Sequence, residues 1–109
     1  MNVQIKEHLE KYPTEIKEMF DVLRRTIFDS ISDEITEIMW ARLPSYCANG
    51  KFIRIIPFKD HINIEASAVV LYRSELSDYK ITPKGMLQIY VHQEIPTEIL
   101  TGIFAKTLK

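Results

Sequence analysis

Acidic side chains are the residues of this 109-residue chain with the clearest capacity for chemistry. Glu15, Glu18 and Asp21 recur at every third position of one expected helix, so two of them could share a cation. A denser acidic group follows at the helix end and just after it, and it consists of Asp29, Asp33, Glu34 and Glu37. Because hard cations bind preferentially to clustered carboxylates, these residues predict a weak, exchangeable metal site. The alternative is that they only make the helix surface soluble.

A second set of side chains predicts a pocket for a small anionic or planar ligand. The set combines aromatic rings with one imidazole and one ammonium group, and it consists of Trp40, Pro44, Tyr46, Phe58, His61 and Lys84. Alternatively, the rings belong to the hydrophobic core, in which case the Tyr46 hydroxyl and the Trp40 indole nitrogen need buried partners. No further ligand stands at metal-binding spacing from His61, which favours a structural histidine there.

The chain carries no sequence signature of catalysis. Its three glycines, at positions 50, 85 and 102, form no glycine-rich phosphate loop. No Gly-x-Ser-x-Gly nucleophile motif occurs, and no cysteine-enzyme motif surrounds Cys47. We therefore expect a protein without enzymatic activity, and an enzyme that uses His61 is the less favoured alternative.

The composition, with 46% hydrophobic and 27% charged residues, is that of one soluble globular domain covering residues 1–109. The longest apolar run, Ala68 to Leu71, is too short to span a membrane, and the polar N-terminus does not resemble a signal peptide. A single cysteine allows no internal disulfide, which favours the reducing cytoplasm. We expect a cytoplasmic protein that binds no membrane.

Charge is unevenly distributed along the chain. Residues 1–39 carry five Lys or Arg against nine Asp or Glu, whereas residues 40–109 carry nine against six. The front of the chain is therefore acidic and the remainder mildly basic. The formal net charge of −1 argues against nucleic acid as the main partner.

Hydrophobic periodicity predicts two helices followed by three strands. The helices cover residues 2–11 and 14–31, with Asn2 and Thr14 as their expected caps. The second helix carries an apolar stripe that should face the core, and it consists of Ile16, Met19, Phe20, Leu23, Ile27 and Ile31. Residues 35–42 have the composition of a strand that ends at Pro44-Ser45. A turn at residues 48–50 leads into strand 51–58, and a two-residue loop separates it from strand 61–66. Alternation places residues 52, 54 and 56 on one side of the first strand, and it turns residues 62 and 64 of the second inward and residues 61, 63 and 65 the other way. Pro57 indicates an edge position or a bulge, and such an edge could pair with a second copy to form a homodimer.

The last third of the chain completes an α+β pattern. Residues 72–79 indicate a short helix or helical turn, residues 82–85 a turn, residues 86–92 a strand and residues 97–108 a closing helix. Because strands cluster between helices and hairpin connections dominate, we predict an antiparallel sheet with the N-terminal helices and the C-terminal helix packed on one face.

Several motifs, taken in their order, resemble the YdhG-like family of small bacterial domains. They are a Pro-led amphipathic helix from Pro13 to Ile31, the segment from Glu37 through Trp40 to Pro44-Ser-Tyr46, the strand pair around Phe58-Lys-Asp-His61, the turn and strand from Lys84 to Tyr90, and the final Pro-led helix from Pro96. One position departs from the family, because Ala41 stands where an aromatic residue is usual and Trp40 comes one residue earlier.

The resemblance implies a two-layer, frataxin-like fold and a function, because some members are described as frataxin-like intracellular iron chaperones. It implies iron held loosely by Glu15, Glu18, Asp29, Asp33, Glu34 and Glu37, and delivery to iron–sulfur or haem assembly proteins. The alternative is a small-ligand or protein-partner binding module that uses the aromatic side around Trp40, Tyr46, His61 and Lys84.

Overall fold

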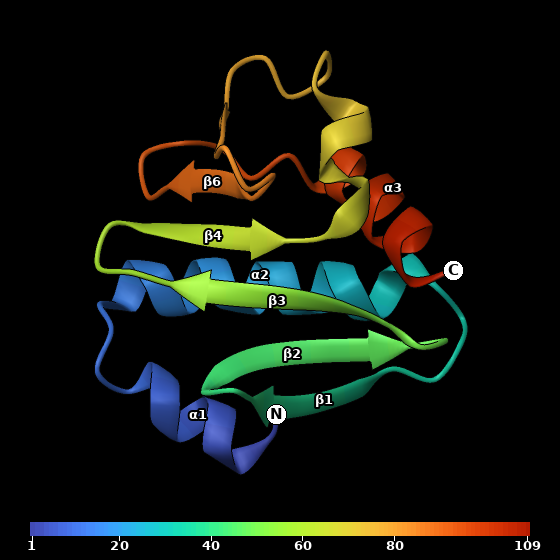
Figure 1. Ribbon diagram of the computed structural model, residues 1–109. Coiled ribbons are helices and arrows are strands. Elements are labelled where there is room, and N and C mark those ends of the chain that lie inside the picture. Colours follow the sequence, from blue (N-terminus) through green and yellow to red (C-terminus); the bar gives the residue numbers. More distant parts are fainter.

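Six antiparallel strands form one sheet in the order β1-β2-β3-β4-β6-β5 in the computed structural model, which describes residues 1–109 (Figure 1). The strands are β1 Thr36–Trp40, β2 Leu43–Ala48, β3 Lys51–Pro57, β4 His61–Glu65, β5 Lys80–Ile81 and β6 Leu87–Tyr90. The helices are α1 Val3–Leu9, α2 Thr14–Ser30 and α3 Thr97–Leu108, with a 3-10 helix, η1, at Ser67–Tyr72. The predicted α+β fold, with helices at both ends of the chain around an antiparallel sheet, is confirmed.

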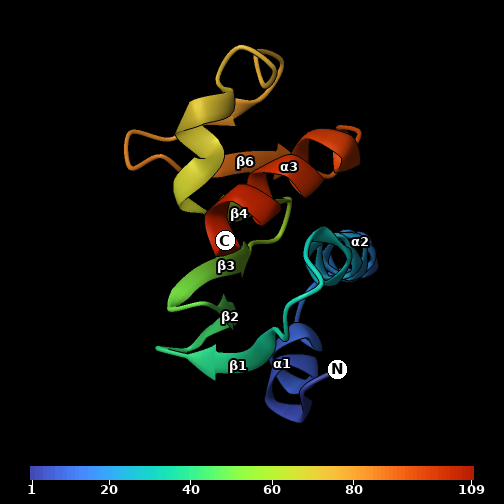
Figure 2. The same cartoon turned by 90° about the vertical axis from the view of Figure 1, so that its right-hand side faces the viewer.

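The helices lie on one side of the sheet, so the fold has two layers (Figure 2). The predicted stripe of α2 is buried and meets α3 and the inner side of the sheet in a core of 24 residues. The Asn2 side chain caps α1 by accepting hydrogen bonds from the backbone of Gln4 and Ile5. Thr14 does not cap α2, because the cap position is taken by Pro13 and no side chain bonds there. No helix is long and apolar enough to cross a membrane.

The segment from residue 35 to residue 48 forms a hairpin, and the prediction that Pro44-Ser45 ends a strand is wrong. β1 stops at Trp40, and Ala41 and Arg42 form a two-residue turn with φ angles of 52° and 66°. This is the geometry of a type I′ turn, which normally carries Asn or Gly because other residues rarely adopt positive φ. Neither Ala41 nor Arg42 carries that turn signal.

The hairpin between β2 and β3 follows the sequence prediction. Its turn residues, Asn49 and Gly50, have φ angles of 55° and 73° and are the preferred residues of a type I′ turn. Pairing between these strands ends at Ser45 and Arg54, one residue before Pro44 on β2. Proline has no backbone N–H to donate across the ladder. The predicted edge strand at Pro57 is wrong, because β3 lies between β2 and β4. The proline is tolerated there because β2 no longer pairs with β3 at that position.

The connection after β4 agrees with its prediction in part. The 3-10 helix η1 covers residues 67–72, earlier than the expected short helix. Residues 73–79 form turns, and the backbone N–H of Leu76 donates to the carbonyl of Tyr72 as in a helical turn. Leu76 is buried in the core. β5, which has only two residues, was not predicted. The closing helix α3 covers the predicted residues 97–108.

Strand alternation gives the sheet two different faces. Ile53, Ile55, Ile62, Ile64, Leu87 and Ile89 are completely buried under the helices. The opposite side, which we call the open face, is covered by none of the three α-helices, and η1 borders it at one end (Figure 2). Strand register places on it Trp40, Phe52, Arg54, His61, Asn63, Glu65, Lys80, Gln88 and Tyr90.

Candidate functional site

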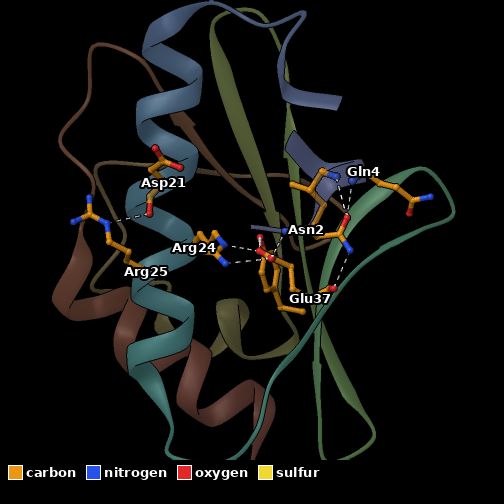
Figure 3. A network of polar contacts seen from close by, with 8 residues as sticks. Asn2, Gln4, Asp21, Arg24, Arg25 and Glu37 are labelled. Carbon is orange, nitrogen blue, oxygen red and sulfur yellow. Dashed lines mark hydrogen bonds and ion pairs between the residues drawn. The ribbon is translucent and has the colours of Figure 1, made fainter. Parts of the chain in front are cut away.

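The carboxylate of Glu37 is the most completely bonded polar group of the chain (Figure 3). Its Oε1 accepts from the backbone nitrogen of Asn2 at 2.9 Å and from Arg24 Nη2 at 3.2 Å. Its Oε2 accepts from Arg24 Nε at 2.5 Å and from the hydroxyl of Tyr46 at 2.8 Å. The bonds join β1 to the start of α1, to α2 and to β2. Glu37 is therefore a structural tie between four elements.

The electrostatics of this network keep Glu37 charged and Tyr46 protonated. Burial raises the pKa of the Glu37 carboxyl, but hydrogen bonds from Arg24, from the backbone of Asn2 and from Tyr46 outweigh burial, so its pKa lies below the ordinary value. Burial, and then the hydrogen bond to Glu37, raise the pKa of the Tyr46 hydroxyl. The hydrogen bond to Glu37 raises the pKa of Arg24. The ionised Glu37 accepts hydrogen bonds from the protonated Arg24 and Tyr46, so each group stabilises the protonation state in which its neighbour can form the bond.

The other predicted metal ligands lie on the surface. Glu15 and Glu18 are exposed on α2, and Asp29, Asp33 and Glu34 are exposed at its end and just after it. Asp33 Oδ2 accepts a hydrogen bond from Asn49 at 3.2 Å. No three His, Cys, Asp or Glu side chains of the chain are grouped so that they could hold a metal ion. Glu37 differs from the other five because four donors already occupy its carboxylate.

The six residues of the predicted ligand pocket do not come together in one cavity. Pro44 and Tyr46 are buried, and Tyr46 points into the helix side of the sheet, where its ring contacts Phe28. Trp40 and His61 lie on the open face, and Lys84 lines a cleft that contains none of the other five. The alternation of β1 and β2 separates Tyr46 from Trp40, because Tyr46 is opposite Glu37 in the ladder and Trp40 is opposite Leu43.

An arginine between two aromatic rings occupies the first part of the open face. The Arg54 guanidinium lies 4.4 Å from the centre of the Trp40 ring and 4.7 Å from that of Phe52. Arg54 Nη1 also donates to Glu65 Oε1 at 3.3 Å, whereas its Nε is buried without a partner. Trp40 is nevertheless 49% exposed. We name Trp40, Phe52, Arg54 and Glu65 the Arg54 cluster.

A second group of rings lies further along the same face. The His61 ring is stacked on Phe58, with 4.5 Å between ring centres and 8° between planes. Its other neighbour is Tyr90, 4.8 Å away, and its Nδ1 lies 2.8 Å from Asp60 Oδ1. We name Phe58, His61 and Tyr90 the His61 stack. The bond to Asp60 orients the imidazole and leaves its flat faces in contact with the neighbouring rings.

Two amide side chains lie between these groups. Asn63 is opposite Gln88, in the row between the Arg54–Glu65 pair and the His61–Tyr90 pair. Asn63 Oδ1 and Gln88 Oε1 are buried and accept no hydrogen bond. Buried acceptors without donors are uncommon in folded proteins because they lose their hydration without compensation. All three buried side-chain atoms that lack a partner, including Arg54 Nε, therefore come from the open face.

A cleft of about 340 Å³ adjoins the Arg54 cluster. Phe52 and Glu65 form its sheet side, and Ser67 and Val70 of η1 form its opposite side. Lys51 and Lys84 add two exposed ammonium groups. The open face therefore continues into a concave, cationic border.

Sequence reasoning missed both arginine partnerships. The signal for Glu37 was its position between Ile35 and Met39, because this alternation turns a carboxylate toward an apolar layer, where it needs donors. The signal for Arg54 was the alternation of residues 52, 54 and 56, which was predicted correctly. What covers that side of the sheet was not predictable from the same pattern.

The fold and these surfaces define the class of protein: a two-layer α+β domain with one covered and one open sheet face. Comparison with known proteins finds no matching family model, no matching curated protein and no matching solved structure.

Proposed function

We propose that this protein is a non-enzymatic binding domain that recognises its ligand or partner with the open face of its sheet. The observation that carries the proposal is the gathering of exposed rings, one arginine and unbonded polar atoms on the only sheet face without helices. Exposed aromatic residues together with arginine are enriched in recognition surfaces, because both contribute large contact areas. Folding leaves these groups incompletely satisfied, and a bound molecule would satisfy them.

The state of His61 supports recognition over catalysis. Its ring lies flat between Phe58 and Tyr90, so its largest surfaces make ring contacts. Asp60, which bonds its Nδ1, is on the exposed loop between β3 and β4. The arrangement fits a ring that contributes area to a binding surface.

A fragment screen followed by NMR of the isotope-labelled protein tests this function. Planar and anionic fragments should shift the amide signals of β3, β4 and β6. Trp40→Ala should weaken the affinity for these fragments about tenfold or more. Leu71→Ala is the matched control, since Leu71 is an exposed apolar residue of η1 outside the open face. Hits confined to the groove between α1 and α2, near Leu9 and Lys17, would overturn the proposal.

A second candidate is the frataxin-like iron chaperone that the family resemblance implies. It is supported by the exposure of Asp29, Asp33 and Glu34 around the end of α2, because a carrier needs weak, accessible carboxylates. In this function Glu15 and Glu18, at the other end of α2, would be a separate pair of acidic groups, and iron–sulfur or haem assembly proteins would receive the metal. Glu37 would act through the fold, since its oxygens are already bonded.

Anaerobic titration with ferrous iron tests the second candidate. Paramagnetic broadening of amide signals should be confined to residues 29–34 and disappear in the double variant Asp33→Asn, Glu34→Gln. The double variant Glu75→Gln, Glu98→Gln removes the same charge from exposed positions elsewhere and should retain the broadening. Equal broadening in both double variants, or none in the natural protein, would exclude an iron site there.

A further inference from the structure

We infer that the open face binds single-stranded nucleic acid. The inference rests on the proposed binding function and names its ligand. Charge is its first support, because the tertiary structure separates the acidic and basic parts of the chain. The open face and its cleft bring together Lys51, Arg54, Lys80 and Lys84, whereas the carboxylates at this face are Glu65, which bonds Arg54, and Asp60, which bonds His61. The exposed acidic residues of α2 lie on the opposite side of the sheet (Figure 1). A net charge of −1 for the whole chain therefore coexists with a cationic sheet face.

Ring surfaces are the second support. The Arg54 cluster extends from Trp40 on β1 to Glu65 on β4, and the His61 stack extends from β4 to Tyr90 on β6 of the same open antiparallel sheet. Glu65 and His61 are four residues apart on β4, so at about 3.3 Å per residue the two groups are offset along this strand by on the order of 13 Å. In RNA-recognition modules, an open antiparallel sheet binds a single strand by stacking bases on the aromatic rings that it displays. Two such platforms at this separation can each hold a base of one strand.

The polar atoms between the platforms are the third support. Asn63 and Gln88 each carry an amide with an acceptor that no protein donor reaches. Side-chain amides pair with the edges of bases, whose amino groups donate and whose ring nitrogens accept. A rotation of either amide toward solvent would present both its oxygen and its nitrogen to a base stacked beside it. Arg54 Nε, the unbonded donor, lies at the neighbouring position of the same face.

An acidic peptide is the competing ligand for a cationic face. It would use Lys51, Lys80 and Lys84, but it would make no use of the exposed ring surface of Trp40 and Phe58. The combination of lysines at the border, exposed rings and amides between the rings matches phosphates and bases together. The observations therefore favour the nucleic acid strand.

Fluorescence anisotropy with a labelled decanucleotide of uridine tests the inference, and a duplex of equal length and a decapeptide of glutamate serve as competing probes. The single strand should bind more tightly than either. Trp40→Ala and Tyr90→Ala should each raise Kd about tenfold, the effect of losing one stacked base. Leu71→Ala should leave Kd unchanged. Circular dichroism of each variant establishes that it is folded.

Salt dependence separates phosphate contacts from stacking. About three phosphate contacts predict that log K falls against log salt with a slope near −2, at roughly −0.7 per phosphate for a single strand. The double variant Lys51→Gln, Lys84→Gln should reduce that slope by about 1.4. The double variant Lys106→Gln, Lys109→Gln removes the same charge from the last turn of α3 and from the residue that follows it, and it should not change the slope.

Each result decides between the two levels of the inference. Tighter binding of the glutamate peptide, or binding of the oligonucleotide that Trp40→Ala and Tyr90→Ala leave unchanged, would overturn the nucleic acid ligand. If the oligonucleotide does not bind while planar fragments still shift β3, β4 and β6, the nucleic acid ligand fails and the binding face remains. If neither binds the open face, both fail.

Discussion

The Glu37 network and the Arg54 cluster both pair an arginine with a glutamate beside aromatic rings, yet they lie on opposite faces of one sheet. Arg24 lies 4.9 Å from the Phe28 ring, much as Arg54 lies 4.4 Å from the Trp40 ring. Both oxygens of Glu37 are bonded, whereas Arg54 makes one bond to Glu65 and keeps a buried Nε without a partner. The same residue types thus build a closed structural tie where helices cover them and an incomplete surface where they do not.

Removal of the Glu37 carboxylate should have the largest effect on stability. Glu37→Ala leaves Arg24 and the Tyr46 hydroxyl without their acceptor at a site where the Glu37 side chain is only 9% exposed. We expect a loss of about 3 kcal/mol in the free energy of unfolding, measured by chemical denaturation. Glu65→Ala is the matched change on the open face and should cost less than about 1 kcal/mol. Equal losses would mean that both glutamates hold the fold.

Tyr46→Phe should have the next largest effect, because it removes one hydrogen bond to a charged acceptor and nothing else. We expect a loss of about 2 kcal/mol in thermal or chemical unfolding. Tyr90→Phe, the corresponding change in the His61 stack, should alter stability by less than about 0.5 kcal/mol. A loss for Tyr90→Phe as large as that for Tyr46→Phe would show that the Tyr90 hydroxyl also contributes to stability through a hydrogen bond, contrary to the comparison.

Acid should remove the contribution that the Glu37 network makes to stability. Because the pKa of Glu37 is lower in the folded state than its ordinary value of 4.5, the unfolded chain takes up the proton first. The contribution to stability is therefore fully present above about pH 4.5 and is lost as pH falls through the folded pKa. The free energy of unfolding, measured by chemical denaturation at a series of pH values from neutral to acidic, should fall more steeply for the natural protein than for Glu37→Gln. Parallel curves would contradict this assignment.

Changes at the two hairpin turns should have the smallest effects and opposite signs. Arg42→Gly relieves a positive φ at the turn that follows Trp40, and it should stabilise the fold by up to about 1 kcal/mol. Gly50→Ala at the same turn position of the next hairpin should cost about 1 kcal/mol, although its new Cβ would meet no atom within 4 Å. Melting temperatures measure both changes. A destabilising Arg42→Gly would mean that the Arg42 side chain contributes contacts that outweigh its strained backbone.

Local patterns predicted the elements whose causes are local. Asn49 and Gly50 indicate their turn because both residues tolerate positive φ. The alternation of residues 52–56 and 61–65 assigned each side chain to its correct face. The stripe of α2 from Ile16 to Ile27 was identified because helical periodicity alone defines which side is apolar. α3 was predicted over its full length for the same reason.

Elements that depend on distant contacts were missed. Ala41 and Arg42 turn the chain without any turn residue, because the pairing of β1 with β2 imposes the positive φ angles. β5 has two residues and exists because it pairs with β6. The predicted ligand set of Trp40, Tyr46, His61 and Lys84 was separated by strand alternation and by the turn at residues 41–42, which the sequence did not indicate.

From the residues alone it follows that the chain is an α+β domain, which faces of its helices and strands are apolar, and where an acidic front meets a mildly basic remainder. The partners of Glu37 depend on the folded chain, because Tyr46, Arg24 and Asn2 stand 9, 13 and 35 residues away from it in the sequence. The same holds for the open face. Alternation assigns residues to a side of the sheet, but whether helices cover that side depends on how α1, α2 and α3 pack, and packing is a property of the whole chain.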